Sequence, residues 1–156
     1  MHKFLIGEDE KNILGEDLIK SILKITLPEK IIMLRYDLLT KPIILGNDLI
    51  LGYTKNESTK NYLYINLNDN SVNHKWNYEK SSSVFINSNI ELLEKSLNVL
   101  DFYLDDLIEQ KELGEYHIFH QRYANLLERL LTKIDSKSVL IGFWQNLIEE
   151  MKLGVI

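Results

Sequence analysis

The spacing of apolar residues changes twice along the chain and divides it into three stretches. In the first, up to about residue 27, apolar residues recur every three or four positions, which is typical of an amphipathic helix. They are Ile13, Leu14, Leu18, Ile22 and Ile25. Pro28 ends this predicted helix, because proline cannot continue a helix and biases the preceding residue toward extended backbone.

The middle stretch, residues 31–86, consists of short apolar runs separated by turn-forming residues. Residues 62–67 alternate, with leucine and isoleucine on one face and Tyr62 and Tyr64 on the other. Segments 46–48 and 68–71 are rich in Gly, Asn and Asp, which tolerate left-handed backbone and are typical of turns. Runs of this length between turns predict an antiparallel meander of about five to six short strands.

The third stretch, after about residue 88, predicts three helices. Ser88 followed by Glu91 has the pattern of a capping box at the first helix start. Leucines then recur at steps of four and three, and a second apolar stripe follows Gly114. Across the three helices, the residues expected to be mostly buried are Leu93, Leu97, Leu100, Leu104, Leu127, Leu130, Trp144 and Leu147.

The last of these helices has its own expected limits. Asp135 or Ser136 is expected to cap its start, and its buried stripe is expected to begin at Leu140. Gly154 stands where a glycine commonly ends a helix.

Together the three stretches predict one α+β domain over residues 1–156. It has an N-terminal helix, a mainly antiparallel sheet within residues 31–86, and three C-terminal helices packed on one face of the sheet. A chain of 156 residues lies within the usual range of about 100–200 residues per domain.

Composition narrows the classes of function. Eighteen basic and 23 acidic residues give a formal net charge of −5, so we expect neither nucleic acid nor membrane as a partner, since both need cationic surface. With no cysteine, disulfides and thiolate chemistry are excluded. The apolar run at the start is too short for a signal peptide and turns acidic at Glu8, so a cytoplasmic location is expected.

No catalytic motif stands out, so we expect no enzyme activity and no cofactor. The nucleophile elbow, the P-loop and the dinucleotide-binding fingerprint are all absent from the sequence. His117 and His120 have a spacing that suits two ligands of one metal, but no third possible ligand lies at a sequence spacing typical of metal sites. We therefore expect no metal site.

The predicted helix after Ser88 carries an acidic side. Asp101, Asp105, Asp106 and Glu109 lie away from the leucine stripe, and no basic residue occurs between Lys95 and Lys111. Like charges four residues apart on a helix cost about 0.2–0.5 kcal/mol each. An ordinary solvated face of an acidic protein accounts for this pattern, and so does a docking face for a basic partner.

A second candidate surface is the hairpin from Tyr62 to Tyr78. Trp76 and Tyr78 gather there with His74 and two further tyrosines. Such aromatics usually form cross-strand pairs or core. If the sheet face opposite the helices is open, Trp76 and Tyr78 are candidate partner-binding anchors.

The order of motifs resembles the SUKH immunity superfamily, most closely its fourth subfamily. The similarity runs from about residue 25 to residue 154. It includes Thr26-Leu27-Pro28-Glu29 after the first helix, Ile44-Leu45-Gly46-Asn47-Asp48, and the hairpin from Leu63 to Val72. Phe85-Ile86-Asn87-Ser88 looks like the family's strand-to-helix signature, and the end is similar at Phe143-Trp144. Where family members often have Thr-Gly before the position of Val72, this chain has Asn70-Ser71.

The resemblance implies an α+β fold without catalytic residues. Bacterial members of the family bind and neutralise polymorphic toxins, often nucleases, in the cytoplasm of the producing cell. The expected partner is thus a cognate toxin domain, basic if it is a nuclease, and the chain itself is expected to be a monomer or a weak homo-oligomer. An intracellular regulatory or scaffold protein of the same fold is the alternative, and a small enzyme whose site assembles only in three dimensions is a third reading.

Overall fold

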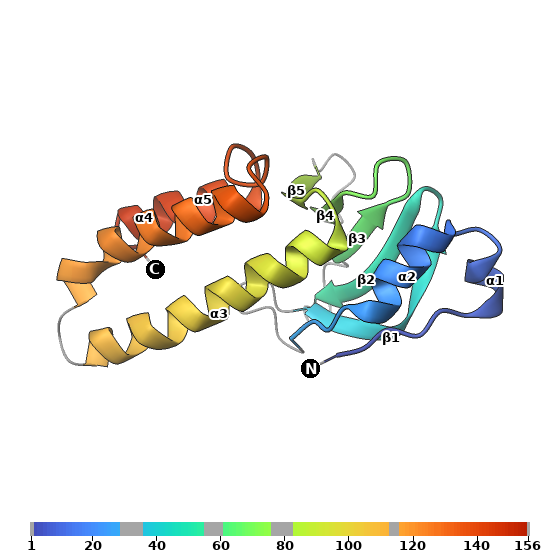
Figure 1. Cartoon of the computed structure of the whole chain (residues 1–156), viewed down its shortest axis with the longest axis horizontal. Helices are drawn as coiled ribbons and strands as arrows, with labels where there is room; N and C mark the ends of the chain where they lie inside the picture. The colour runs from blue at the N-terminus through green and yellow to red at the C-terminus, as the bar shows by residue number, and fades with distance from the viewer. Residues whose placement is uncertain (1, 29–35, 55–60, 76–82, 113–115, 156) are drawn as a thin grey trace. The chain divides into compact units, whose positions relative to one another are not determined.

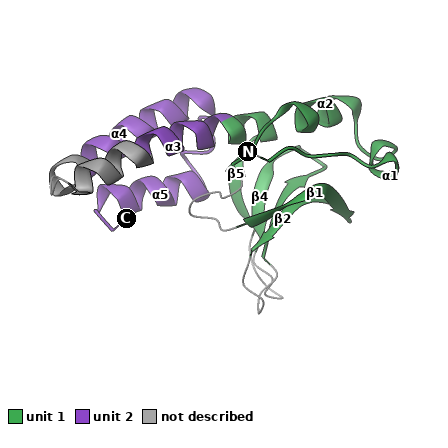
Figure 2. Ribbon diagram, turned by 90° about the horizontal axis from the view of Figure 1, so that it is seen from below, with its two compact units in different colours: residues 1–94 green, residues 95–156 purple. Residues whose placement is uncertain are grey.

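The computed structural model describes residues 2–28, 36–54, 61–75, 83–112 and 116–155. For residues 104–112 and 116–119 it describes the backbone but not the side chains. The chain divides into two compact units, residues 1–94 and 95–156, which are coloured separately in Figure 2. The first unit holds the sheet and the N-terminal helices, and the described residues of the second unit form helices and turns without a strand. That the whole chain is one domain, with the C-terminal helices packed on one face of the sheet, stays a prediction.

A single antiparallel sheet forms the centre of the first unit (Figure 1). Its strands are β1 (Tyr36–Leu45), β2 (Asp48–Thr54), β3 (Tyr62–Asn66), β4 (Val72–Lys75) and β5 (Val84–Asn87). They lie in the order β1-β2-β3-β4-β5, each antiparallel to its neighbour. The α+β class and the antiparallel meander expected from the sequence are therefore confirmed.

Both turns expected from the sequence are present. Gly46 has φ +62° between β1 and β2, and Asn70 has φ +60° between β3 and β4. These left-handed conformations suit glycine and asparagine, which adopt them at little cost. Asp69 supports the second turn, because its carboxylate accepts hydrogen bonds from both the backbone N–H and the hydroxyl of Ser71. The turns fix the register of the hairpins.

The N-terminal segment forms two helices where the sequence pattern predicted one. They are α1 (Glu8–Lys11) and α2 (Glu16–Lys24). The break falls at Gly15, which is extended and stands as the N-cap of α2. Ile13, expected on the buried stripe, is 65% exposed because it lies in this break. Helical spacing alone did not show that the chain turns here.

α2 lies on one face of the sheet (Figure 2). Leu14 and Leu18 line a pocket together with Leu67. Leu67 follows the end of β3 and lies on the same side as Leu63 and Ile65, because side chains two residues apart in a strand share a face. Leu63 and Ile65 are fully buried. We therefore assign this as the helix-covered face, and the opposite face carries Tyr62 and Tyr64.

The first C-terminal helix, α3 (Ile90–Glu112), begins differently from the expected capping box. Its cap is Asn89, whose side-chain oxygen accepts a hydrogen bond from Leu92 N–H at 2.9 Å. Ser88 is therefore not the cap. Glu91 accepts a hydrogen bond from the Ser21 hydroxyl of α2 at 3.1 Å, so this side chain serves tertiary packing.

In the second unit, α4 (Tyr116–Ile134) and α5 (Phe143–Lys152) follow α3. The expected start of the last helix at Asp135 or Ser136 is wrong. The backbone oxygen of Asp135 accepts hydrogen bonds from Ser138, which forms a turn, and Gly142 with φ +85° precedes α5. Leu140 is accordingly 70% exposed and does not belong to the buried stripe.

The end of α5 and most of the predicted core are confirmed. Gly154 has φ +69°, and hydrogen bonds from Gly154 N to Met151 O and from Val155 N to Glu150 O close the helix as a Schellman motif. The core residues that prove buried are Leu93, Leu97, Leu100, Leu127, Trp144 and Leu147. Leu130 is only half-buried, since its neighbour Leu131 takes the inner position, and the Leu104 side chain lies outside the described part.

Candidate functional site

The face of the sheet opposite α2 carries a row of tyrosines. In β3, Tyr62 and Tyr64 point to the same side because they are two residues apart, and their rings lie 5.5 Å apart. The ladder pairs Tyr62 with Lys75 of β4 and with Tyr53 of β2. Tyr62 and Lys75 are half-buried, whereas Tyr64 is buried. These side chains therefore form a surface across three strands.

A chain of hydrogen bonds joins residues of three strands on this surface. The Tyr62 hydroxyl hydrogen-bonds to the Asp48 carboxylate of β2 and to the Lys75 ammonium of β4. A hydroxyl can donate to the carboxylate while it accepts from the ammonium, so the three groups satisfy one another. The Lys75 Nζ also lies 5.8 Å from the centre of the Tyr62 ring, within the range of a cation–π contact.

The protonation states of Asp48 and Lys75 depend on their surroundings. Partial burial raises the pKa of the Asp48 carboxyl, although Lys75 and the Tyr62 hydrogen bond act in the opposite direction. The pKa of Lys75 is raised, chiefly by its hydrogen bond with Tyr62. Lys75 thus keeps its positive charge at neutral pH, and it can offer remaining N–H donors to a partner.

Tyr64 is held by a separate contact. Its hydroxyl lies 2.6 Å from the hydroxyl of Ser83, a residue just before β5. Burial raises the pKa of Tyr64, so its phenol stays protonated at neutral pH. We call the set of Asp48, Tyr62, Tyr64, Lys75 and Ser83 the tyrosine cluster.

The tyrosine cluster continues into exposed apolar residues at the β1 edge. Ile43 pairs with Ile50, which pairs with Tyr64, and Leu45 pairs with Asp48. Directly paired residues share a face of an antiparallel sheet, so Ile43 and Leu45 lie on the side of the tyrosines. They are 48% and 62% exposed. The face therefore combines aromatic, charged and apolar groups, the mixture usual at protein–protein contacts.

The aromatic anchors expected from the sequence are only partly placed. Trp76 and Tyr78 lie outside the described residues, directly after the end of β4 at Lys75. His74 lies on the helix-covered face, since it pairs with Leu63, and it is buried edge-on against Tyr36 at 5.3 Å. His74 therefore does not gather with Tyr62 and Tyr64.

The acidic residues Asp101, Asp105, Asp106 and Glu109 all belong to α3, as expected. Asp101 is half-buried and engaged in an interaction of its own. The side chains of the other three lie outside the described part. Their role as a docking face stays a prediction.

His117 and His120 are the two histidines whose sequence spacing suits two ligands of one metal. His117 lies in the region whose side chains are not described, and His120 packs near the end of α5, where a Cβ on Gly154 would come within 3.4 Å of its ring. Among the described residues, no group of three or more His, Asp or Glu side chains could hold a metal ion. Likewise, no described helix is long and apolar enough to cross a membrane.

Sequence reasoning missed three members of the tyrosine cluster. Asp48 falls in the segment 46–48 that was assigned to a turn, and neither Lys75 nor Ser83 was singled out by the sequence pattern. The alternation within each strand does place Tyr62 and Tyr64 on one face. The register across the turn at residues 68–71 is what adds Lys75, and sequence alternation alone does not supply it.

Compared with known proteins, the chain matches no family model, and neither a curated protein nor a solved structure matches it. The resemblance to the SUKH superfamily therefore remains a prediction from the order of its sequence motifs.

Proposed function

We propose that this chain is an immunity protein that neutralises a cognate toxin by stoichiometric binding in the cytoplasm, without catalysis. The toxin and the compartment come from the resemblance of the sequence motifs. The single observation that supports binding is the tyrosine cluster with its apolar flank at Ile43 and Leu45. Tyrosine is enriched at binding hot spots, because it buries a large rigid ring and keeps a polar hydroxyl for a specific hydrogen bond.

The hydrogen bonds of the cluster favour binding for a second reason. Asp48, Tyr62 and Lys75 are already held together in the free protein. A partner therefore meets side chains that have already lost part of their rotamer freedom, which lowers the entropy cost of association. The Asp48 and Lys75 charges also compensate each other, so covering them leaves no isolated charge under the interface.

The acidic residues of α3 add an expectation about the partner. Four acids from Asp101 to Glu109 without an intervening base would attract a basic protein, as nuclease domains usually are. Charges at the rim of an interface raise the association rate more than they slow dissociation. The tyrosine cluster would supply the short-range contact and the acids the long-range attraction.

The test of the proposal is co-expression with the toxin domain encoded by the neighbouring gene. Growth rescue and a stable one-to-one complex on gel filtration are expected. Tyr62→Ala should weaken the complex by about tenfold or more, as loss of an aromatic hot spot does. Leu23→Ala is the matched control, since Leu23 lies on α2 and is 48% exposed. No rescue and no complex with wild type would reject the proposal.

The acidic residues have their own test. Replacing Asp101, Asp105 and Glu109 with Asn, Asn and Gln should slow association with the toxin and reduce its dependence on salt. Dissociation should change little. An on-rate that is unchanged at two salt concentrations would show that these residues only solvate the helix.

The alternative is an intracellular regulatory or scaffold protein with this fold. Such a protein would use the same surface for a different partner, so Tyr62→Ala would weaken that complex as well. A neighbouring gene for a secreted protein with a C-terminal toxin domain favours immunity. Its absence, together with recovery of a cellular partner that depends on Tyr62, favours the regulator.

A further inference from the structure

β1 forms one edge of the described sheet, since the strands follow one another in order from β1 to β5 (Figure 1). Its last residues, 43–45, come after a bulge that shifts the register between Leu38 and Ile43. Pro42 stands directly before them. Proline has no backbone N–H and within sheets is confined to edges and bulges, so its place here agrees with an edge strand.

The turn after β1 fixes which backbone groups of this edge point outward. Two residues separate Leu45 from Asp48, and the residues that close a two-residue turn exchange both of their N–H···O bonds. Bonded and non-bonded pairs alternate along an antiparallel ladder. Ile44, one residue before Leu45, therefore forms no backbone bond to β2, and its N–H and C=O point to the outer side of the sheet.

The N-terminal segment bonds to an earlier part of the same edge. The Leu5 N–H donates to the Thr40 oxygen at 2.8 Å, and the Nε2 of His2 lies 3.0 Å from the Leu39 oxygen. Among the residues that the structure describes, no backbone hydrogen bond outside the ladders reaches Ile44. The outward N–H and C=O of Ile44 are thus placed to pair with a further strand.

Exposed apolar side chains flank these backbone groups. Ile43 and Leu45 are 48% and 62% exposed and lie on the same face as the tyrosine cluster. Neighbouring strands of a sheet lie about 4.8 Å apart, so a strand added to β1 would place alternate side chains beside Ile43 and Leu45. The added strand and the tyrosine cluster would then form one continuous surface.

We propose, on the basis of the immunity function proposed for this chain, that a segment of the toxin pairs with residues 43–45 as an added strand. Its backbone would donate to and accept from Ile44, because an outward N–H and C=O on one residue are matched by another extended backbone. Its apolar side chains, two residues apart, would lie against Ile43 and Leu45.

The short length of this edge favours a partner that also reaches the tyrosine cluster. One outward donor and one outward acceptor on Ile44 bury far less surface than the roughly 1,000 Å² that a stable interface needs. Two copies of this chain joined only by their β1 edges would share just this contact. A toxin that adds a strand here also covers the adjacent tyrosine cluster, so the strand sets its orientation and the cluster supplies most of the affinity.

Amide hydrogen exchange, followed residue by residue by NMR, tests the backbone pairing. In the free chain the Ile44 amide should exchange fast, whereas the amides of Ile43 and Leu45, which are bonded to β2, should exchange slowly. In the complex with the toxin domain encoded by the neighbouring gene, exchange at Ile44 should slow by about tenfold or more. An Ile44 amide that is already slow in the free chain, or that stays fast in the complex, would overturn the proposal.

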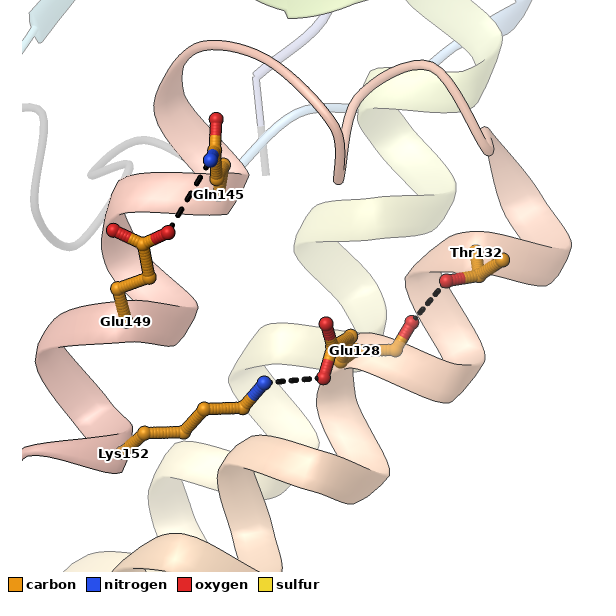
Figure 3. A network of polar contacts seen from close by, with 5 residues as sticks. All are labelled: Glu128, Thr132, Gln145, Glu149 and Lys152. Atoms are coloured by element: carbon orange, nitrogen blue, oxygen red, sulfur yellow. Dashed lines mark hydrogen bonds and ion pairs between the residues drawn. The ribbon is translucent and has the colours of Figure 1, made fainter.

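A charged variant at the same edge gives a second test. Leu45→Lys should weaken the complex about tenfold or more, since a lysine at an edge opposes the addition of a strand. Ile13→Lys is the matched control, because it adds the same charge in the same unit at a side chain that is 65% exposed. Gln145→Lys adds this charge on α5, where Gln145 donates to Glu149 at 3.2 Å (Figure 3). Neither control should weaken the complex, and equal weakening by all three variants would contradict a specific role of this edge.

Failure of the added strand can be told apart from failure of the immunity function. A stable complex in which the Ile44 amide still exchanges fast overturns the strand and leaves the immunity function standing. Absence of any complex rejects both. Self-association of the free chain that protects the Ile44 amide would show that a second copy pairs with this edge, and it would overturn the toxin as the occupant.

Discussion

His74 makes the stability of this protein depend on pH in a direction that can be worked out. Its side chain is only 4% exposed and lies edge-on against Tyr36 under the helix-covered face of the sheet. Burial lowers the pKa of His74 from 6.5 to about 4, because the charged imidazolium loses its hydration there. The folded state therefore resists protonation that the unfolded chain accepts readily.

The direction in which stability changes with pH follows from which state binds the proton first. As pH falls through about 6.5 the unfolded chain takes up a proton at this histidine, and the folded chain does so only near pH 4. Stability is thus retained above about pH 6.5, is lost as pH falls, and levels off below about pH 4. At 1.36 kcal/mol per pH unit, the loss between pH 7 and pH 5 is about 2 kcal/mol.

The assay is urea unfolding at pH 7 and pH 5, with wild type and His74→Phe compared at each pH. Phenylalanine keeps a ring against Tyr36 and removes the titration. The wild type should lose about 2 kcal/mol more than His74→Phe over this range. His2→Gln is the control, since it also removes a histidine but keeps a donor for the Leu39 carbonyl, and it should behave as wild type. An equal loss in wild type and His74→Phe would refute the reasoning.

Three further changes should be measured by the same unfolding assay. Trp144→Ala should cost about 3–5 kcal/mol, because Trp144 is fully buried, and a silent change would refute its place in the core. Gly52→Ala should cost about 1–3 kcal/mol or more, since a Cβ would lie 2.7 Å from the Asp37 backbone oxygen. Gly15→Ala meets nothing within 4 Å and should cost less, since only the place of Gly15 as the N-cap of α2 disfavours alanine there. Asn89→Ala should cost about 1 kcal/mol through the lost cap of α3, and Asn89→Ser should restore most of it.

The sequence by itself determined the elements whose signals are local. Alternation in residues 62–66 follows from the pleat of a strand, and the turns at Gly46 and Asn70 follow from the backbone freedom of those residues. Gly154 ended the last helix for the same reason. The apolar stripes likewise identified Trp144 as core, because a large apolar residue on the inner side of an amphipathic helix has nowhere else to go.

Which residue caps the start of α3 depended on competition between two neighbouring side chains. Ser88 and Asn89 are both good caps, and the sequence pattern favoured Ser88 because Glu91 completes its capping box. In the structure Glu91 bonds to Ser21, which stands 70 residues earlier in the chain, and Asn89 caps the helix instead. A contact over that distance leaves no local sequence signal.

The tyrosine cluster was decided by tertiary structure alone. Tyr62 meets Lys75 through the register of one hairpin and Asp48 through hydrogen bonding across to another strand. Each side chain by itself is an ordinary strand or turn residue. Side-chain chemistry is local, but the burial that raises the pKa of Asp48 and the hydrogen bond with Tyr62 that raises the pKa of Lys75 come from the pairing of strands, which depends on the whole sheet.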